Sequence, residues 1–587
     1  MTPFNETLSA KLAEAFAALG RDDLPEGFAP AVTAAADTRF GDYQSNAALV
    51  LAKRLKTNPR ELAANLIEKI DVADLCETPE IAGPGFINFR IRPDKLAGRL
   101  SALLDDGRLG VSTTDAPHRI LIDLSSPNVA KPMHIGHVRS TIIGDSLARI
   151  ARFLGHHVVT DNHIGDWGTP IGQVLYGWKR KLDKAAFEAD PVAELLRLYQ
   201  EVKKAFDSDP EVEKACLEET VKLQSGDPEN LALWQQFCEI TATDRSQTYL
   251  RLDITFDKEL GESFYDDRLA SLVEQLLADG TAEESDGAIC VFSNGEVDPK
   301  DDPLLVQRDG EWVPVPCLIR KKDGGFNYAT TDIATIDYRI GEEKADDVLY
   351  VVDDRQSLHF RQVFDVARRR GIVATLKHVA FGKILGEDRK PYKTREGTVP
   401  ALADVLDDAV ARARTVVDDK SAALPEEEKV EIAERIGIGS VKYAELSQNR
   451  ASDYVFDWDK MLSLDGNTAP YLLYAYVRTR SIFRKLGDES PDLSGELAIT
   501  EDAEKTLAMK LCQYGELVPT LLDDHRPNLL ANYLYELAQT YHSFFTSCHV
   551  LSAEGATRTT RLALCELTSR VLKHGLSLLG IRVAERM

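Results

Sequence analysis

The chain has 587 residues, enough for about three or four domains, and its 44% hydrophobic and 28% charged residues are ordinary for a globular protein. This composition excludes a disordered or fibrous chain, and no apolar run approaches the roughly 20 residues that a membrane span requires. The net charge of −25 excludes a surface covered in basic residues for non-specific nucleic-acid binding.

The eight cysteines are scattered, and none forms a C-x-x-C pair, which argues against a zinc ribbon or a thiol redox centre. We therefore expect no protein-held metal site. The segment Met1–Ala10 lacks the basic and apolar regions of a secretory signal. Together with the single cysteines, this favours a protein of the reducing cytoplasm.

Residues 1–112 are expected to form a small α+β domain. Residues 46–56 and 59–70 carry apolar side chains at helical spacing, and Gly83-Pro84-Gly85 predicts a turn. The alternation of apolar and polar residues over Phe86–Ile91 predicts a strand.

Residues 117–400 are expected to form a parallel α/β domain. Arg119–Leu124 is an apolar strand, a Pro-containing loop follows, and the spacing predicts a helix over His137–Leu154 that Gly155 ends. His157–Thr160 predicts the next strand. A strand, a helix and a second strand in this order begin a Rossmann-like parallel sheet.

Two insertions interrupt this domain. The charged stretch of about 181–250 predicts helices, and the short apolar runs of about 280–325 predict a small antiparallel piece. The α/β pattern then resumes with a strand at 348–352, a helix at 357–370 and a strand at 378–381.

The remainder is expected to be helical, with a connecting segment over 401–460 and a bundle over 461–587. Four stretches carry helical apolar spacing: Leu473–Leu486, Ala508–Leu522, Leu529–Phe545 and Arg558–Leu579. The fold class expected is α/β, with a Rossmann-like parallel-sheet domain carrying insertions, a small α+β N-terminal domain and an all-α helical bundle at the C-terminus.

The strongest motif lies between the first strand and the first helix of the α/β domain. There His134 and His137 stand on either side of Gly136 where the helix begins. Backbone amides and the positive end of the helix attract phosphate, and imidazole N–H groups add donors for a phosphoryl oxygen. Gly136 would let a flat ring approach the backbone. Two surface histidines on a capped helix are the alternative, but the position after a strand favours function.

A second motif follows the last strand of the α/β domain. Gly386–Thr398 is bounded by glycines and carries Lys390 and Lys393. A cation-rich loop beyond the C-terminal end of a parallel strand can close over a polyphosphate. A solvated basic turn is the commoner meaning of such a run, so the loop alone does not decide.

On these two motifs the chain resembles the class I aminoacyl-tRNA synthetases, and most closely the arginyl-tRNA synthetases. His134–His137 matches the HIGH signature of that class, and Lys390–Thr394 resembles its KMSKS loop, with Pro391 and Tyr392 in place of Met and Ser. The resemblance extends from Asp42–Asn46 to the terminal Leu579–Met587, which is essentially the whole chain.

The resemblance implies the roles of several residues. The groups that would stabilise charge at the reacting phosphorus are His134, His137, Lys131, Lys390 and Lys393. The residues that would contact ATP are Met133, Gly136, His134, His137 and Lys393.

A guanidinium is recognised best by carboxylates in bidentate geometry. Tyr328 and Asp332 are four apart, on one face if the segment is helical. By resemblance, Tyr328, Asp332 and Asp123 face the guanidinium of arginine, while Ser125, Asn128 and Gln356 hold its α-amino and carboxylate end.

The implied reaction has two steps. Arginine attacks the α-phosphorus of ATP, supplied with Mg²⁺, and the arginyl group then passes to the 2′-OH of the terminal adenosine of tRNA(Arg). The expected partners are tRNA(Arg), L-arginine and ATP, with no membrane, and we expect a monomer. The C-terminal bundle would be the anticodon-binding domain, and a few of its exposed aromatics could stack on unpaired bases.

Two other readings remain open at this point. A small-molecule nucleotidyltransferase can share the H-x-G-H loop, and a non-catalytic relative could bind tRNA alone. His163 matches a loop near the active site of the family without a readable role. His359 could equally face ATP or join the hydrophobic core.

Overall fold

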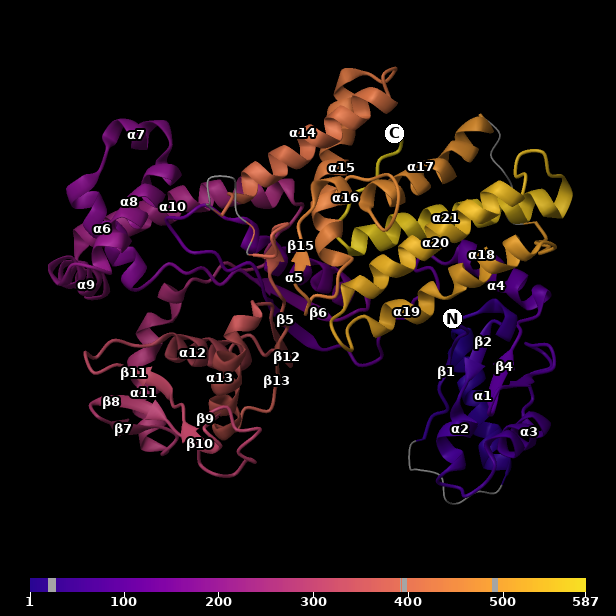
Figure 1. Ribbon diagram of the computed structural model, residues 1–587, viewed down its shortest axis with the longest axis horizontal. Helices are drawn as coiled ribbons and strands as arrows, with labels where there is room; N and C mark the ends of the chain where they lie inside the picture. The colour runs from indigo at the N-terminus through magenta and orange to yellow at the C-terminus, as the bar shows by residue number, and fades with distance from the viewer. Residues whose placement is uncertain (20–27, 391, 393–398, 488–492, 494) are drawn as a thin grey trace. The chain divides into compact units, whose positions relative to one another are not determined.

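The computed structural model describes residues 1–19, 28–390, 392, 399–487, 493 and 495–587 (Figure 1). The chain forms two compact units, which are described separately below. The first unit comprises Met1–Thr113, Ser463–Leu578 and Arg582–Met587, and the second comprises Thr114–Leu462 with Leu579–Ile581. Within the described ranges, none of the helices has both the length and the apolar character needed to cross a lipid bilayer.

The first unit combines a small sheet with helices from both ends of the sequence. Its N-terminal elements are α1 (Phe4–Ala18), β1 (Val32–Ala34), η1 (Thr38–Phe40), β2 (Tyr43–Ser45), α2 (Ala47–Ala52), α3 (Pro59–Lys69), β3 (Glu80–Ala82), β4 (Phe86–Phe89) and α4 (Pro93–Asp105). Its C-terminal helices are α17 (Ala469–Lys485), α18 (Asp502–Cys512), α19 (Tyr514–Thr520), α20 (Pro527–Ser547) and α21 (Gly555–Leu578).

The sheet of the first unit is antiparallel, in the order β1-β2-β4-β3. Tyr43 of β2 is opposite Phe89 of β4, and both side chains are buried. The hydroxyl of Tyr43 donates to Glu516 Oε1 of α19 at 2.5 Å, and Lys505 of α18 forms an ion pair with Asp42 at 3.2 Å. Partly buried polar contacts therefore join the N-terminal sheet to the C-terminal helices.

The second unit contains the remaining elements. The α/β framework consists of β5 (Arg119–Asp123), α5 (Ile135–Phe153), β6 (His157–Asp161), α12 (Tyr328–Gly341), β12 (Asp347–Tyr350), η3 (Asp354–Gln356), α13 (Ser357–Arg369), β13 (Thr375–His378) and β14 (Ile384–Leu385). The helical insertion consists of α6 (Thr169–Lys181), α7 (Lys184–Ala189), α8 (Pro191–Phe206), α9 (Pro210–Gln224) and α10 (Pro228–Arg251).

A smaller antiparallel insertion precedes α12, and helices follow β14. The elements before α12 are η2 (Glu262–Tyr265), α11 (Asp266–Ala278), β7 (Glu283–Ser285), β8 (Ala288–Val291), β9 (Leu305–Arg308), β10 (Glu311–Pro314) and β11 (Cys317–Arg320). The elements after β14 are α14 (Leu402–Lys420), α15 (Glu426–Leu446), β15 (Tyr454–Val455) and α16 (Trp458–Met461).

The central sheet is parallel, in the order β13-β12-β5-β6. Its register places Tyr350 opposite Asp123, and Asp123 opposite Asp161, so the strands end at one shared edge. The chain leaves β5 toward β6 on one side and later returns to pair β12 on the other. Such a switch in strand order is where open α/β sheets bind ligands, and it is where the loop before α5 lies.

Helix α5 lies close against β5 because Gly144 has no side chain. A Cβ at Gly144 would stand 2.5 Å from Cβ of Leu124, which is closer than two carbon atoms can approach. The apolar residues Val138, Ile142 and Leu147 of this helix are buried. The first turn of α5 is thereby held at the C-terminal edge of the sheet.

The sequence predicted this framework with small errors at its ends. Helix α5 begins at Ile135, two residues before the predicted start, because His134 and not a later residue is its N-cap. The strand expected at 378–381 was wrong in position, since the regular strand β13 covers Thr375–His378. Beyond His378 the backbone keeps only an isolated bridge between Phe381 and Asp353.

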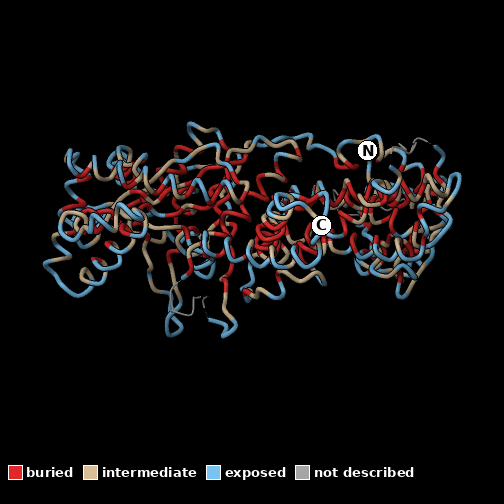
Figure 2. Tube along the Cα trace, turned by 90° about the horizontal axis from the view of Figure 1, so that it is seen from above, coloured by how far each residue is buried: buried red, intermediate tan, exposed pale blue. Residues whose placement is uncertain are grey.

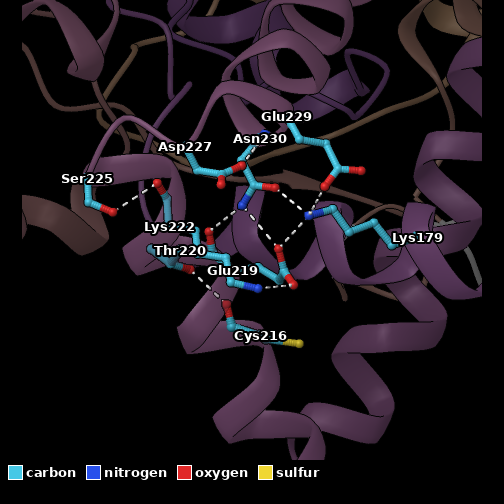
Figure 3. Close-up of polar contacts among 9 residues, drawn as sticks. All are labelled: Lys179, Cys216, Glu219, Thr220, Lys222, Ser225, Asp227, Glu229 and Asn230. Atoms are coloured by element: carbon cyan, nitrogen blue, oxygen red, sulfur yellow. Dashed lines mark hydrogen bonds and ion pairs between the residues drawn. The ribbon is translucent and has the colours of Figure 1, made fainter.

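The helical insertion has its own buried polar cluster (Figure 3). Lys179 Nζ of α6 donates to Glu219 Oε2 of α9 at 2.9 Å and to Asn230 Oδ1 of α10 at 2.5 Å. Hydrogen bonds from Lys179, Asn230 and Lys222 outweigh the desolvation of Glu219 and lower the pKa of its carboxyl to about 2. The ion pair ties three helices of the insertion together.

Buried residues run through the interior of each unit, and exposed residues concentrate on the connections (Figure 2). In the second unit, one cluster of buried side chains lies between the sheet and the helices α11, α12 and α13. A separate cluster around Phe237 and Leu195 lies within the helical insertion.

Candidate active site

The first turn of α5 brings two histidines together. His134 caps the helix, and its backbone N–H donates to His137 Nδ1 at 3.0 Å. The Nδ1 atom of His134 accepts from the backbone N–H of Gly136 at 3.1 Å. The two rings stack with 3.9 Å between their centroids. The backbone of one helix N-terminus therefore holds both imidazoles.

Gly136 leaves the space in which the ring of His134 lies. A Cβ at this position would stand 2.8 Å from Cε1 of His134 and 2.9 Å from its Nδ1. The ring that approaches this glycine is thus the chain's own imidazole, whereas the sequence analysis had left the identity of the ring open. Any larger residue would turn His134 away from its capping position.

Both imidazoles are neutral at neutral pH. Desolvation of the half-buried His137 ring, with His134 beside it, lowers the pKa of His137 to about 3. Desolvation also lowers the pKa of His134. Since each Nδ1 accepts a hydrogen bond from the backbone, the proton of each ring lies on Nε2. The helix N-terminus thus carries two neutral N–H donors beside its own positive dipole end.

Residues just before α5 place a lysine and a methionine at this turn. Lys131 Nζ lies 3.8 Å from the ring centroid of Tyr199, a residue of α8 in the helical insertion. Met133 is buried, and its carbonyl accepts from the backbone N–H of Leu402 at 2.8 Å. The buried Met133 therefore anchors the turn, while the Lys131 ammonium lies at its rim.

The second cationic motif begins in a tight turn after β14. The backbone N–H of Gly386 donates to the carbonyl of Lys390 at 2.8 Å, and the N–H of Lys390 donates to Asp388 Oδ1 at 3.1 Å. The side chain of Lys390 is exposed. Lys393, which the sequence analysis also assigned to this motif, lies outside the described residues.

Tyr328 and Asp332 lie one turn apart at the start of α12, as their spacing predicts. Tyr328 is the first helical residue and is 64% exposed. Asp332 Oδ2 lies 2.5 Å from His359 Nε2 of α13. His359, whose role the sequence left open, is thus within hydrogen-bond distance of Asp332. The histidine orients the carboxylate of Asp332.

Glu262 is an acidic residue of this site that the sequence analysis missed. It begins η2 and is half-buried; burial, with Asp332 and Asp166 nearby, raises the pKa of Glu262 to about 8. Burial and the nearby Glu262 also raise the pKa of Tyr328. A turn of four residues has no apolar periodicity by which it could have been found. Two carboxyl groups and a phenol thus lie close enough to influence one another, and these three side chains are called the acid-lined slot below.

Tyr199 joins this slot to the first turn of α5. Its ring contacts Lys131, and it contributes, after burial and Glu262, to the raised pKa of Tyr328. The sequence analysis assigned no role to Tyr199, because an aromatic residue on an amphipathic helix is usually part of the core. The acid-lined slot and the histidine turn are therefore neighbours.

Asp123 does not face this slot with a free carboxylate, contrary to the expectation from sequence. Its Oδ2 accepts from Arg339 Nη2 at 2.7 Å, and its Oδ1 accepts from Ser126 Oγ at 2.9 Å. The same Arg339 nitrogen donates to Asp161 Oδ2 at 2.8 Å. Arg339 is fully buried. The guanidinium that Asp123 binds is thus that of the chain's own α12, which sequence spacing alone could not reveal.

The remaining expected contacts divide into one buried and two exposed residues. Ser125 is buried; its Oγ accepts from Thr141 Oγ1 at 2.9 Å and lies 2.8 Å from the hydroxyl of Tyr249. Asn128 and Gln356 are exposed; Asn128 lies in the loop that follows β5, and Gln356 is the last residue of η3, which follows β12. The two amides can reach a ligand at the edge of the sheet, whereas the hydroxyl of Ser125 is engaged within the protein.

His163 lies in the same acidic neighbourhood as Glu262. Its ring centroid is 5.6 Å from that of Tyr265. Burial raises the pKa of Asp161 and of Asp166, and the nearby His163 opposes this rise in both. Its buried Nδ1 has no hydrogen-bond partner among the described residues. His163 therefore belongs with the carboxylates and not with the histidine turn.

This arrangement can bind two charges of opposite sign side by side. The N–H donors of the helix N-terminus suit a polyphosphate, and the Asp332–Glu262–Tyr328 slot suits an organic cation with several N–H donors. A carboxylate on the cation would then lie beside the phosphate chain. Such an arrangement suits a reaction in which the carboxylate attacks a phosphorus atom of the nucleotide.

Three family models match the chain in order. The N-terminal domain of arginyl tRNA synthetases matches residues 4–91, the catalytic domain of class I (R) tRNA synthetases matches residues 99–458, and the DALR anticodon binding domain matches residues 472–587.

Curated relatives and solved structures agree with these matches. The arginine–tRNA ligase of Synechococcus elongatus is 45% identical, over 98% of this chain and 99% of its own length. That of a Nostoc species is 44% identical over all of both chains. The arginyl-tRNA synthetase structure from Thermus thermophilus has a TM-score of 0.82 at 25% identity, and that from Plasmodium falciparum 0.81 at 27%; both cover all of the two chains.

The pairing of Asp123 with Arg339 predicts a large effect on folding. In Asp123→Asn, a buried guanidinium loses one of its two carboxylates, so the free energy of unfolding should fall by about 3 kcal/mol. Chemical denaturation followed by circular dichroism measures this. The control is Asp354→Asn, which removes an exposed carboxylate near the same edge of the sheet and should change the free energy by less than about 0.5 kcal/mol. Equal stability of both variants would contradict the assignment.

Proposed function

The chain belongs to the class I arginyl-tRNA synthetase family, and from that premise we propose how its residues divide the work of an arginine–tRNA ligase. It activates L-arginine with ATP and attaches the arginyl group to tRNA. The 45% identity over 98% of the chain carries this assignment, and the acid-lined slot beside the histidine turn agrees with it. The rival readings are not favoured, because matches to an anticodon binding domain and to the N-terminal domain of arginyl tRNA synthetases accompany the catalytic one.

We propose that the α5 turn binds the phosphates of ATP. The Nε2–H groups of His134 and His137 donate to the phosphoryl oxygens as charge grows on them, and the helix dipole adds to the field. Lys131 and Lys390 supply positive charge, together with Lys393, on the family pattern. Because both imidazoles are neutral, they act as hydrogen-bond donors and not as acids.

We propose that the arginine side chain enters the slot between α12 and η2. Asp332, oriented by His359, accepts from the guanidinium, and Glu262 accepts from its other edge once it is ionised. Tyr328 covers the opening. Asn128 and Gln356 hold the α-amino and carboxylate groups, and Ser125 supports the loop through Thr141 and Tyr249.

In the first step the protein needs only to place the arginine carboxylate and the α-phosphorus of ATP correctly. An oxygen of the arginine carboxylate attacks the α-phosphorus, a new carboxyl–phosphate bond forms, and pyrophosphate leaves with its electron pair. In the second step the 2′-OH of the terminal adenosine of tRNA attacks the arginyl carbonyl and AMP leaves. The protein supplies positioning and electrostatic stabilisation.

Mg²⁺ is expected to arrive with ATP. Among the described residues, no group of three or more histidine, cysteine, aspartate or glutamate side chains could hold a metal ion. Magnesium in nucleotide sites is commonly bound through substrate phosphates and only a few protein ligands. We assign it no residue of this chain and no step.

We propose that tRNA bases stack on one aromatic surface of the C-terminal helices. The Arg478 guanidinium of α17 lies 4.8 Å from the ring of Tyr474 and 5.5 Å from that of Phe545 in α20. Tyr474 is 44% exposed, and the rings of Tyr471 and Tyr535 meet edge to face with 5.5 Å between their centroids. Exposed rings with an arginine suit unpaired bases. Of the aromatic residues of α20, Tyr533, Tyr541 and Phe544 are buried.

The division into four domains, with a connecting segment at 401–460, stays a prediction from the sequence, as do the monomeric state and the cytoplasmic location. The bundle at 461–587 would be the anticodon-binding domain and the unit at 1–112 a second tRNA contact.

The proposed function predicts one result in a charging assay. Purified protein, ATP, Mg²⁺ and total tRNA should attach arginine to tRNA and none of the other amino acids, lysine included. A lysine ammonium lacks the planar set of donors and would leave buried acceptors unpaired. Charging of another amino acid, or nucleotide transfer without tRNA charging, would overturn the proposal.

The slot predicts the effect of Asp332→Asn. The Michaelis constant for arginine should rise about 10- to 100-fold, the value of one charge-assisted hydrogen bond, while that for ATP changes less than about twofold. The control is Asp337→Asn on the same helix, where the carboxylate pairs with Arg370. Initial-rate kinetics measure both. Equal increases for arginine and ATP would refute the assignment of the slot.

The raised pKa of Glu262 predicts a pH dependence. Below pH 8 this carboxyl is mostly protonated, so arginine binding must release a proton. The Michaelis constant for arginine should therefore fall as the pH rises from 6 to 8, by at most about tenfold per unit. In Glu262→Gln the constant should be higher and independent of pH over this range. A profile that persists unchanged in the glutamine variant would show that another group titrates.

A further inference from the structure

Arg139 is a buried cation of α5 to which the reaction described above assigns no part. Its side chain is 1% exposed. The guanidinium lies 2.9 Å from Glu445 Oε2 of α15, and it donates to the carbonyls of Ser452 and Arg450 at 3.1 and 3.3 Å. One planar group thus holds a carboxylate and two backbone carbonyls.

The ion pair between Arg139 and Glu445 is enclosed by further side chains. The carboxylate of Glu445 is fully buried, and it also accepts from the hydroxyl of Tyr454. The guanidinium lies 5.3 Å from the ring of Tyr454 and 5.7 Å from that of Phe381. A charge buried at such cost is balanced only when every partner is in place.

The carbonyls that Arg139 holds belong to the loop 450–453. This loop contacts the residues just before Gly386–Thr398, the motif that contains Lys390 and Lys393 and is called the lysine motif below. The carbonyl of Arg450 also accepts from the N–H of Gly382 at 2.9 Å, and Asp453 Oδ1 accepts from the N–H of Lys383 at 2.6 Å. A Cβ at Gly382 would stand 2.7 Å from the carbonyl carbon of Ser452, so the two backbones touch.

This contact continues into the strands that follow. β14 pairs with β15 in parallel, with Ile384 opposite Tyr454. The turn that ends at Lys390 follows β14 directly, and the N–H of Tyr392 returns to donate to the carbonyl of Ile384 at 3.0 Å. The position of Lys390 therefore depends on where the loop 450–453 is held.

The residues that follow the lysine motif are hydrogen-bonded to the start of α5. The N–H of Leu402 donates to the carbonyl of Met133 at 2.8 Å, and the N–H of Ile135 donates to that of Pro400 at 3.2 Å. The described residues before and after the motif are thus both attached to α5, which carries His134 and His137 in its first turn.

We propose that Arg139 is a positioning residue for adenylate formation, which holds Lys390 in register with the two histidines of α5. The inference rests on the proposed function, because it assigns the two motifs to opposite sides of one nucleotide. Arg139 does not touch the reacting atoms. It fixes the distance between two sets of charges that must contact the same phosphates.

The test is Arg139→Lys, assayed by arginine-dependent ATP–pyrophosphate exchange in the presence of tRNA. Lysine keeps the charge beside Glu445 but cannot span two carbonyls as well. We expect kcat per folded enzyme to fall about 10- to 100-fold, since displacement by about 1 Å can cost that much. The Michaelis constant for arginine should change less than about twofold.

Glu445→Gln is the second variant, and it decides the question if Arg139→Lys does not fold. It should also lower kcat while sparing arginine binding. The matched control is Glu219→Gln, which removes the carboxylate of the buried ion pair with Lys179 in the helical insertion (Figure 3). We expect the control to lose thermal stability, but its kcat per folded enzyme should stay within about twofold of the wild type.

Two results would overturn the proposal. One is a kcat per folded enzyme within about twofold of the wild type in the variants that fold, which would make Arg139 a purely structural residue. The other is a fall in kcat of the same size in Glu219→Gln. Failure of the proposed function itself is separate, because it would appear as absent arginine charging by the wild-type protein.

Discussion

The site depends on one buried guanidinium. Asp123 and Asp161 stand opposite each other where β5 and β6 end, and without a cation between them two carboxylates would repel in a region closed to water. Arg339 supplies that cation from α12 and donates to both. Its helix begins with Tyr328 and Asp332, so the ion pair also sets where the substrate slot lies. The chain thus pairs Asp123 and Asp161 with its own arginine, whereas Asp332 and Glu262 are the carboxyl groups that we propose bind the ligand.

Two electrostatic environments of opposite sign are kept apart by this arrangement. At the α5 turn, desolvation lowers the pKa of both histidines, so the effect on phosphate that we propose for them comes from directed N–H groups and the helix dipole. In the slot, desolvation and neighbouring carboxylates make Glu262 retain its proton until a cation arrives. Burial therefore acts on both sides of the site, and in each case it holds the neutral form before substrate binds.

The local pattern of the sequence predicted the parallel framework, the histidine turn and the face of α12, because each depends on residues close together in the chain. Contacts between distant segments were not predictable in this way. Asp123 was assigned to the substrate because nothing near it in sequence shows Arg339, and Glu262 was missed because a short turn has no periodicity. The strand predicted at 378–381 followed apolar content, whereas the regular pairing ends at His378.

The contact between Tyr199 and Lys131 ties the helical insertion to the chemistry. An insertion is often treated as an appendage that can be shortened when a smaller catalyst is wanted. Here the ring of Tyr199 in α8 lies against the ammonium group of Lys131, which we propose acts on the phosphates of the nucleotide. A minimised version of the enzyme that keeps the sheet and both signature motifs would therefore still need a ring at this place.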